Sequence, residues 1–198
     1  MSFAYPVMLD VTGRIAVIVG GGAVAVRKAK ALLAAGAGPV RVVSPDVRPD
    51  LPAEVERVSE RYAARHLDGA FLAFAATNDR AVNDAVVRDA AARGILANRA
   101  DADPDLPGDF ATPALLRRGP VTVAVSSGSA ALTAAVRDGL AGRWDDRWTA
   151  AAEAMRDLRP LVVNHPGLPP ARRTEVLRAL ASEDALARLD TGGVEGLR

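Results

Sequence analysis

Residues 14–31, RIAVIVGGGAVAVRKAKA, decide how this chain folds. A run of branched apolar residues stops at Gly20-Gly21-Gly22, and an alanine-rich segment without proline follows at once. This order predicts a buried strand, a tight turn and a helix. The glycines and Ala25 have the GxGxxA spacing of a dinucleotide-binding turn, in which one glycine bends the chain and one admits a pyrophosphate. The same spacing also fits a plain packing turn, so the rest of the chain must decide.

The composition is that of an ordinary globular protein and excludes several classes of function. The 198 residues suffice for one or two domains, with 49% hydrophobic residues, 25% charged residues and a formal net charge of +1. A net charge so close to zero argues against nucleic acid or a membrane as the main partner. The absence of cysteine excludes disulfides and thiolate catalysis. The first residues do not read as a signal sequence, and we expect a cytoplasmic protein.

Strands and helices alternate through the first half of the chain. Four apolar runs predict buried strands, at residues 15–19, 40–43, 70–76 and 95–97. Residues 55–59 predict a short edge strand, and helices are expected from Gly22 to about Gly36 and over residues 81–93. This alternation predicts an α/β fold with a Rossmann-like, doubly wound parallel sheet.

The pattern changes near Pro113. Residues 110–116 and 121–126 predict two strands outside the alternation. The remaining segments predict helices, at about residues 130–142, 145–158, 172–180 and 183–189. We therefore expect a domain boundary near Pro113, followed by an arginine-rich and mostly helical region.

Polar residues follow the strand at 40–43, at the carboxyl edge of the sheet where doubly wound folds bind ligands. Ser44, Pro45 and Asp46 occupy the place where an NAD site usually carries an acidic residue, although Asp46 comes one or two positions late. Arg41 and Arg48 are near enough to leave NADP open beside NAD. A polar loop that only caps the strand is the competing interpretation.

Two more polar segments follow strands at the same edge. Thr77-Asn78-Asp79 comes after residues 70–76; one of the three caps the next helix, and the others can face a cofactor. The loop after residues 95–97 is acidic and contains Asn98, Asp101, Asp103, Asp105 and Asp109. A carboxylate there can act as a general base or bind a metal, and a solvated acidic loop is the alternative.

Several segments, taken in order, resemble the siroheme synthase N-terminal-domain family, the precorrin-2 dehydrogenase and sirohydrochlorin ferrochelatase group. They are YPVMLDVTGRIAVIVGGGAVAVRKAKALLAAGA (5–37), VRVVSPD (40–46), AFLAFAATND (70–79) with Asn83, NRAD (98–101) and FATPALLRRGPVTVAVSSG (110–128). The resemblance covers about residues 4–142 and is far more specific than the glycines alone. The length is that expected of a standalone protein without the methyltransferase domain of longer family members.

The resemblance implies oxidation of precorrin-2 to sirohydrochlorin with NAD, followed in some members by insertion of ferrous iron to give siroheme. It also implies a homodimer with three parts. These are an NAD-binding Rossmann domain at 1–113, a dimerisation segment at 114–148 and a small helical C-terminal domain at 149–198. The substrate carries many carboxylates, so arginines of the second half are expected to anchor it.

The resemblance also assigns individual residues. The family's N-x-x-D motif maps to Asn98 through Asp101, which makes Asp101 the expected catalytic carboxylate; Asp103 competes because the loop is longer than usual. The expected cofactor contacts are Gly20, Gly22, Ala23, Val24, Ser44, Pro45, Asp46, Thr77, Asn78, Asp79 and Asn98. The expected substrate contacts are Arg117, Arg118 and Ser127, and no metal ligands are assigned.

The sequence departs from the family pattern at one place, and two alternative functions are also consistent with it. The usual GG-x-SP segment is shortened to Gly128-Ser129-Ala130, which affects how the following helix meets the tetrapyrrole. A non-catalytic nucleotide-sensing module would need only the Rossmann part, and a chelatase without dehydrogenase activity would not need a working glycine turn. The arginine-rich region after Pro113 favours a substrate domain.

Overall fold

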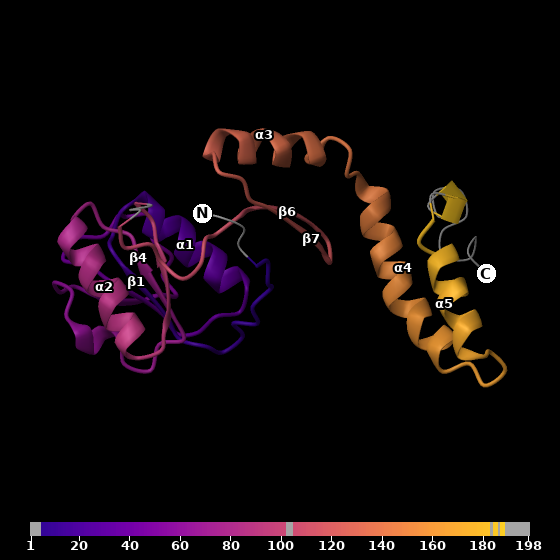
Figure 1. Ribbon diagram of the computed structural model, residues 1–198, viewed down its shortest axis with the longest axis horizontal. Helices are drawn as coiled ribbons and strands as arrows, with labels where there is room; N and C mark the ends of the chain where they lie inside the picture. The colour runs from indigo at the N-terminus through magenta and orange to yellow at the C-terminus, as the bar shows by residue number, and fades with distance from the viewer. Residues whose placement is uncertain (1–4, 102–104, 183, 186, 189–198) are drawn as a thin grey trace. The chain divides into compact units, whose positions relative to one another are not determined.

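The computed structural model describes residues 5–101, 105–182, 184–185 and 187–188. Asp103 and part of the helix expected at 183–189 fall outside the described residues. The chain forms two compact units, Met1–Thr112 and Pro113–Arg198 (Figure 1). They are called unit 1 and unit 2 below and are described separately.

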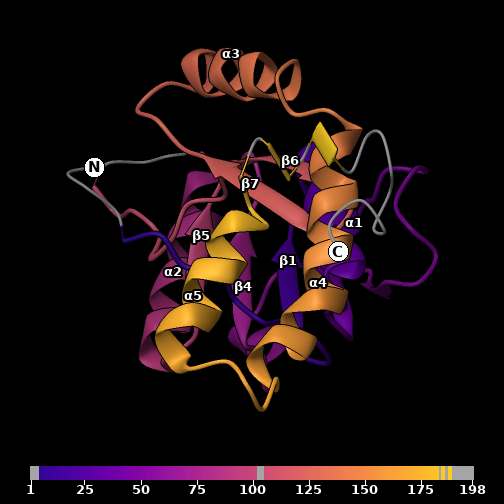
Figure 2. The ribbon, with the colours of Figure 1, turned by 90° about the vertical axis from the view of Figure 1, so that its right-hand side faces the viewer.

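Unit 1 contains a five-stranded sheet in which every strand is parallel to its neighbours. Its strands are β1 (Ala16–Val19), β2 (Val40–Val43), β3 (Glu56–Val58), β4 (Leu72–Ala75) and β5 (Leu96–Arg99). Their order is β3-β2-β1-β4-β5, so β1 is central, with β2 on one side and β4 on the other. Figure 2 shows β1, β4 and β5 of this sheet. This order confirms the predicted doubly wound fold, with β3 as an edge strand.

Two helices cover the two faces of this sheet because side chains alternate along each strand. Ala16 and Ile18 of β1 pack in one apolar cluster with α1 (Ala23–Ala34). Val17 and Val19 pack in a second cluster with α2 (Arg80–Ala92) and the short 3₁₀ helix η1 (Ala64–Leu67). All four residues of β1 are buried, as expected of a central strand covered on both faces.

Unit 2 contains a two-stranded antiparallel sheet and three helices. Its elements are β6 (Ala114–Arg118), β7 (Val121–Val125), α3 (Ala130–Ala141), α4 (Asp146–Val163) and α5 (Pro170–Ala179). Helices α4 and α5 lie side by side (Figure 1). Among the described residues of this unit, Ala154 and Ala185 are buried, and α3 buries none.

Two predicted boundaries in and before unit 2 differ from the structure. The extended run expected from residue 110 becomes a strand only at Ala114, because Phe110 packs edge-on against Phe74 of unit 1, with ring centres 5.5 Å apart. Helix α4 continues past Pro160 to Val163, although a proline inside a helix lacks an N–H donor. The proline lies in the last turn, so little helix follows the missing hydrogen bond. No helix of the described chain is long and apolar enough to cross a membrane.

Candidate functional site

The glycine turn between β1 and α1 leaves one open position. Gly20 has a φ of +124°, and a Cβ there would lie 2.3 Å from the carbonyl oxygen of Ala76. A Cβ on Gly21 would lie 1.9 Å from the carbonyl oxygen of Asp46. A Cβ on Gly22 would meet nothing within 4 Å. Close packing of the backbone therefore requires glycine at positions 20 and 21. At Gly22 the space beside the backbone is open.

Helix α1 begins at this open position without a side-chain cap. Gly22 is its N-cap residue, and no described side chain hydrogen-bonds to its first turn, which contains Ala23 and Val24. The helices α2, α3 and α4, in contrast, are capped by Asp79, Ser129 and Asp145 respectively. Backbone N–H groups at an uncapped helix N-terminus bind anions such as phosphate. The turn thus fits a pyrophosphate.

A pocket of about 400 Å³ opens beside the turn at the carboxyl ends of β1, β2 and β4. Its volume lies within the usual range for small-ligand sites. The pocket is lined by Val19, Gly20, Val43, Ser44, Pro45, Arg61, Tyr62, Thr77 and Val82. Four of the predicted cofactor contacts therefore meet at one place, and the walls are mostly apolar, as an adenine ring requires.

Several polar groups in and after β2 have partners within the protein. Ser44 Oγ donates to the main-chain oxygen of Asp46 at 2.7 Å, and the Asp46 side chain is exposed. Arg41 donates to Glu56 and to the His66 carbonyl oxygen at 3.1 and 3.0 Å. Arg48 pairs with Asp50 at 2.9 Å. Both arginines considered for NADP thus have partners within the protein.

A chain of hydrogen bonds leads from the pocket to Asp101. The side chain of Asn83 is completely buried on α2; its Nδ2 donates to the Thr77 carbonyl oxygen at 3.1 Å and to Asp101 Oδ2 at 2.9 Å. Its Oδ1 accepts from the Thr77 backbone N–H at 3.2 Å. Asn83 therefore fixes the end of β4 and the residue after β5 relative to each other.

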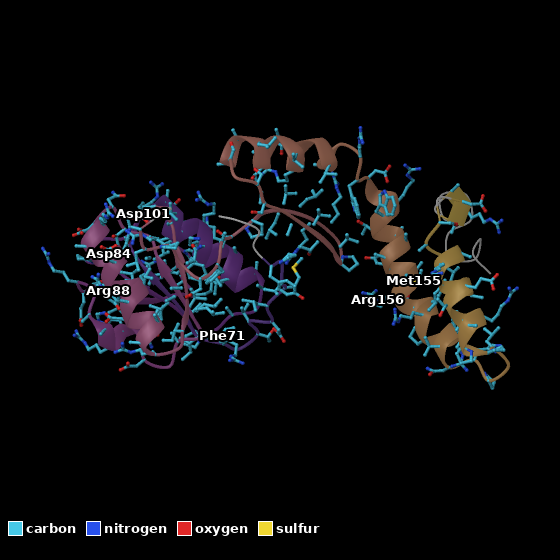
Figure 3. All side chains as sticks on the ribbon, in the orientation of Figure 1. Phe71, Asp84, Arg88, Asp101, Met155 and Arg156 are labelled. Atoms are coloured by element: carbon cyan, nitrogen blue, oxygen red, sulfur yellow. The ribbon has the colours of Figure 1, made fainter. Side chains whose placement is uncertain are left out.

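Asp101 is held as a charged carboxylate. Arg99 donates to it through Nε and Nη2, at 2.6 and 3.1 Å, and also pairs with Asp84. Figure 3 marks Asp84 and Asp101 in unit 1. The Arg99 side chain is only 1% exposed, whereas that of Asp101 is 34% exposed. The hydrogen bonds from Arg99, and then the one from Asn83, hold the pKa of Asp101 below its usual range.

The other described carboxylates of the acidic loop have separate partners. Asp105 pairs with Arg80 at 2.9 Å, and Asp109 Oδ2 accepts from the backbone N–H of Ala97 at 2.8 Å. Asp109 thus binds the outer edge of β5. Among the described residues, no group of three potential metal ligands comes together.

Asn98 and Lys28 form a second polar cluster on the α1 face of the sheet. Asn98 is buried; its Oδ1 accepts from Lys28 Nζ at 2.7 Å, and its Nδ2 donates to the Phe110 carbonyl oxygen at 2.7 Å. Lys28 also donates to Thr112 at 3.3 Å and lies over the ring of Phe74. Burial, and then the nearby charge of Arg27, lower the pKa of Lys28 to about 8. Both ends of the Asn98 amide therefore make contacts inside unit 1.

Asn78 and Asp79, the other cofactor contacts predicted after β4, differ in their surroundings. Asp79 Oδ1 accepts from the backbone N–H groups of Ala81 and Val82 at 2.9 and 3.3 Å, so it is the residue that caps α2. Asn78 is exposed beside it. This matches the expectation that one residue of the triplet would cap the helix.

The predicted substrate residues all lie in unit 2. Arg117 is exposed on β6, and Arg118 is half-buried next to it. Ser127 Oγ donates to the Ser129 carbonyl oxygen at 2.8 Å and lies 2.7 Å from Thr133 Oγ1. Ser129 caps α3 by accepting from Leu132 N–H at 3.4 Å, so the shortened loop still begins the helix with a side-chain cap.

Sequence reasoning did not assign several residues of this region, among them Asn83, Arg99, Arg61 and Tyr62. The buried face of α2 consists of Asn83, Val86, Val87 and Ala90, which have helical spacing. A polar residue within such an apolar stripe was a usable signal. Arg61 and Tyr62 gave no signal, because they lie in an irregular loop that follows β3.

Comparison with known proteins adds an independent finding. Residues 7–114 match the model of a protein family described as "Putative NAD(P)-binding". The chain is 45% identical over 129 residues to a siroheme synthase of Chromobacterium violaceum, a match that covers 63% of this chain and 27% of that protein. It is 35% identical over 175 residues to a siroheme synthase of Photorhabdus laumondii, covering 78% and 37% respectively. The chain thus spans well under half the length of these relatives.

A solved structure resembles nearly the whole chain. The structure of "SirC, precorrin-2 dehydrogenase" has a TM-score of 0.79 and 26% sequence identity with it. The match covers 98% of this chain and 96% of that chain.

Proposed function

The chain belongs to the NAD(P)-binding family that includes the N-terminal domain of siroheme synthases, and from that premise we propose that it oxidises precorrin-2 to sirohydrochlorin with NAD. In this reaction the macrocycle loses a hydride and a proton, and NAD⁺ becomes NADH. The observation that carries the proposal is the hydrogen-bonded connection from Thr77, at the nucleotide pocket, through Asn83 to the charged Asp101. It joins a nucleotide site to an ionised carboxylate at one edge of the sheet.

The residues of unit 1 fit both ends of the adenosine diphosphate part of NAD. The open backbone at Gly22 and the uncapped first turn of α1 would hold the pyrophosphate. The walls at Ser44, Pro45 and Tyr62 would hold the adenosine. When bound, NAD supplies the acceptor for the hydride.

Asp101 contributes a fixed negative charge. Its two oxygens accept three hydrogen bonds from Arg99 and Asn83, out of roughly four lone-pair positions. Its partial exposure leaves the remaining position for substrate. A carboxylate fixed there stabilises the positive charge that develops on the macrocycle as hydride leaves, and it can accept the proton that follows. In members that insert iron, the same carboxylate would help to deprotonate pyrrole nitrogens.

Unit 2 would bind the carboxylates of the tetrapyrrole and a second copy of the chain. Arg117 and Arg118 are the proposed substrate contacts, with Ser127 at the start of the next helix. Leu132 and Val136 of α3 are 55% and 42% exposed, which supports a homodimer formed through residues 114–148. A helix with no buried residue gains little stability by itself. We place the reaction in the cytoplasm, as the sequence led us to expect.

The proposal is tested by incubating the protein with precorrin-2 and NAD while sirohydrochlorin absorbance and NADH fluorescence are recorded together. The two signals are expected to rise in parallel. NAD binding without oxidation would favour the nucleotide-sensing alternative. Consumption of sirohydrochlorin and ferrous iron, without oxidation of precorrin-2, would favour a chelatase alone. Addition of ferrous iron after the oxidation tests for iron insertion as a second activity.

Asp101→Asn keeps the size of the side chain and removes its charge, so it tests the role of the carboxylate. Turnover is expected to fall by at least about a hundredfold, a usual size for loss of a proton-transfer group, while NAD affinity stays unchanged. Asp103→Asn is the matched control in the same loop. Full activity in Asp101→Asn, together with loss in Asp103→Asn, would transfer the role to Asp103.

A further inference from the structure

The segment that follows β3 brings a cation to the nucleotide pocket. Arg61 and Tyr62 line the pocket together with Ser44 and Pro45, although they lie well beyond β2 in the sequence. Ser44 follows β2, where NAD-specific Rossmann proteins usually carry a carboxylate that binds the ribose 2′-hydroxyl. None of the described residues that line the pocket is acidic. Arg61 is therefore the charged residue of the lining.

The backbone that carries Arg61 is anchored on both sides. Tyr62 Oη donates to Asp89 Oδ2 of α2 at 2.9 Å. His66 Nδ1 accepts from the backbone N–H of Ala63 at 3.1 Å, and His66 Nε2 lies 3.3 Å from Glu60 Oε2. These contacts hold residues 60–63 against η1 and α2. The position of Arg61 at the pocket is thus part of the fold of unit 1.

The guanidinium of Arg61 has no hydrogen-bond or ion-pair partner among the described residues, and the side chain is exposed. The neighbouring arginines differ, since Arg41 binds Glu56 and Arg48 binds Asp50. Asp46, an acidic residue of the loop after β2, faces Gly21 with its main-chain oxygen, and its exposed side chain is not part of the lining. A ligand phosphate would therefore meet one uncommitted cation and no lining carboxylate.

We infer that Arg61 gives the adenosine end of the pocket affinity for a 2′-phosphate, so that this protein accepts NADP as well as NAD. This inference rests on the proposed dinucleotide site and adds a specificity residue to it. A 2′-phosphate is a dianion near neutral pH, and arginine binds phosphate through paired N–H donors. An acidic residue in place of Ser44 would oppose this binding by charge repulsion.

The test compares 2′,5′-ADP with 5′-AMP, because these ligands differ only in the 2′-phosphate. Their binding to the full chain is measured by titration calorimetry at low salt. The wild type is expected to bind 2′,5′-ADP at least as tightly as AMP. Arg61→Gln is expected to weaken 2′,5′-ADP about ten- to a hundredfold, the usual loss for a charge-assisted hydrogen bond, and to leave AMP unchanged.

Arg88→Gln is the matched control. Arg88 is an exposed arginine of α2 that does not line the pocket, and its replacement removes the same charge from the same unit (Figure 3). This variant is expected to bind both ligands as the wild type does. An equal effect of both variants on 2′,5′-ADP would assign the effect to net charge and overturn the inference.

Two further outcomes would also overturn it, and they separate it from the proposed function. If AMP binds but 2′,5′-ADP is rejected, the nucleotide site stands and the role of Arg61 falls. If neither ligand binds, the proposed nucleotide site fails as well. Equal weakening of both ligands by Arg61→Gln would indicate a structural role for this residue.

Discussion

Units 1 and 2 differ in how much of their structure is buried. Unit 1 has two apolar clusters, one on each face of its sheet, and four buried polar residues, His66, Asn83, Asn98 and Arg99. In the described part of unit 2, Ala154 and Ala185 are buried, and the helix α3 buries none of its residues. Isolated helices of this length are only marginally stable in water. Unit 1 therefore has the core of an independent domain, whereas the described residues of unit 2 bury little of their apolar surface.

Both units carry exposed ion pairs, such as Arg48–Asp50 in unit 1, and unit 1 also has a buried one. In unit 1, the buried guanidinium of Arg99 is committed to Asp84 and Asp101. The ion pair Arg137–Asp138 of unit 2 is exposed to solvent. Exposed pairs contribute little stability and exchange partners readily. The buried ion pair thus lies in unit 1, in the same unit as the proposed nucleotide site.

The largest expected effect comes from Arg99→Met in unit 1. The substitution leaves the carboxylates of Asp84 and Asp101 without their cation, and breaking a buried pair costs about 3–5 kcal/mol. Denaturant unfolding followed by circular dichroism measures this loss. Arg137→Met, the exposed counterpart in unit 2, is expected to cost less than about 1 kcal/mol. Equal costs would contradict the difference between the two units.

Two glycine substitutions separate folding from binding within unit 1. Gly20→Ala combines a positive φ with a close contact to Ala76, so a loss of about 3 kcal/mol is expected. Gly22→Ala meets open space and should cost less than about 1 kcal/mol. Its Cβ would crowd the pyrophosphate, and NAD affinity measured by calorimetry should fall at least about tenfold, a difference of 1.4 kcal/mol. Normal NAD affinity in a folded Gly22→Ala variant would place the pyrophosphate elsewhere.

The fold of unit 1 was easier to predict from the sequence than the contacts within its candidate site. The apolar runs and the glycines predict β1, β2, β4 and the turn, because a parallel strand buried on both faces must be apolar throughout. The network through Asn83 and Arg99 depends on which side of β5 and α2 each residue faces. Helical spacing places Asn83 on the buried face of α2, but the partners of Asn83 and Arg99 are set by tertiary packing and are not visible in local spacing.

The positions of Arg61, Tyr62 and Phe110 could not be predicted either, and the physical reason differs from one to the next. Arg61 and Tyr62 reach the pocket because β3 is parallel to β2, which returns the chain to the same edge of the sheet. Phe110 belongs to an apolar run that looks like a strand, yet its ring packs on Phe74 instead. The predicted division of residues 113–198 into a dimerisation segment and a helical domain stays a prediction.

A double substitution in unit 2 tests whether a second copy of the chain covers α3. Leu132→Glu with Val136→Glu places charges on the exposed apolar face and should convert a dimer into a monomer in analytical ultracentrifugation. The unfolding midpoint of unit 1 and its NAD affinity should stay unchanged. Leu96→Glu, on the exposed edge strand of unit 1, is the control and should leave the mass unaltered. A monomeric wild type would remove the proposed interface.

A pH dependence of the free energy of unfolding is also expected, and it belongs to unit 1. Because burial lowers the pKa of Lys28 to about 8 from its ordinary 10.5, the folded protein binds fewer protons than the unfolded chain between these values. The free energy of unfolding should therefore gain a contribution that rises with pH across this window. Comparison of the wild type with Lys28→Met by denaturant unfolding isolates this contribution. A difference between the two proteins that stays constant with pH would show that Lys28 titrates normally.

Central to the proposed function is that unit 1 holds the oxidant for a substrate that unit 2 helps to bind. Its most direct test is a single turnover with the full-length protein in excess over precorrin-2 and with NAD present, in which both products are counted. The account predicts equal amounts of NADH and sirohydrochlorin, formed at the same rate. Sirohydrochlorin without matching NADH, or no oxidation in a protein that binds both ligands, would contradict it.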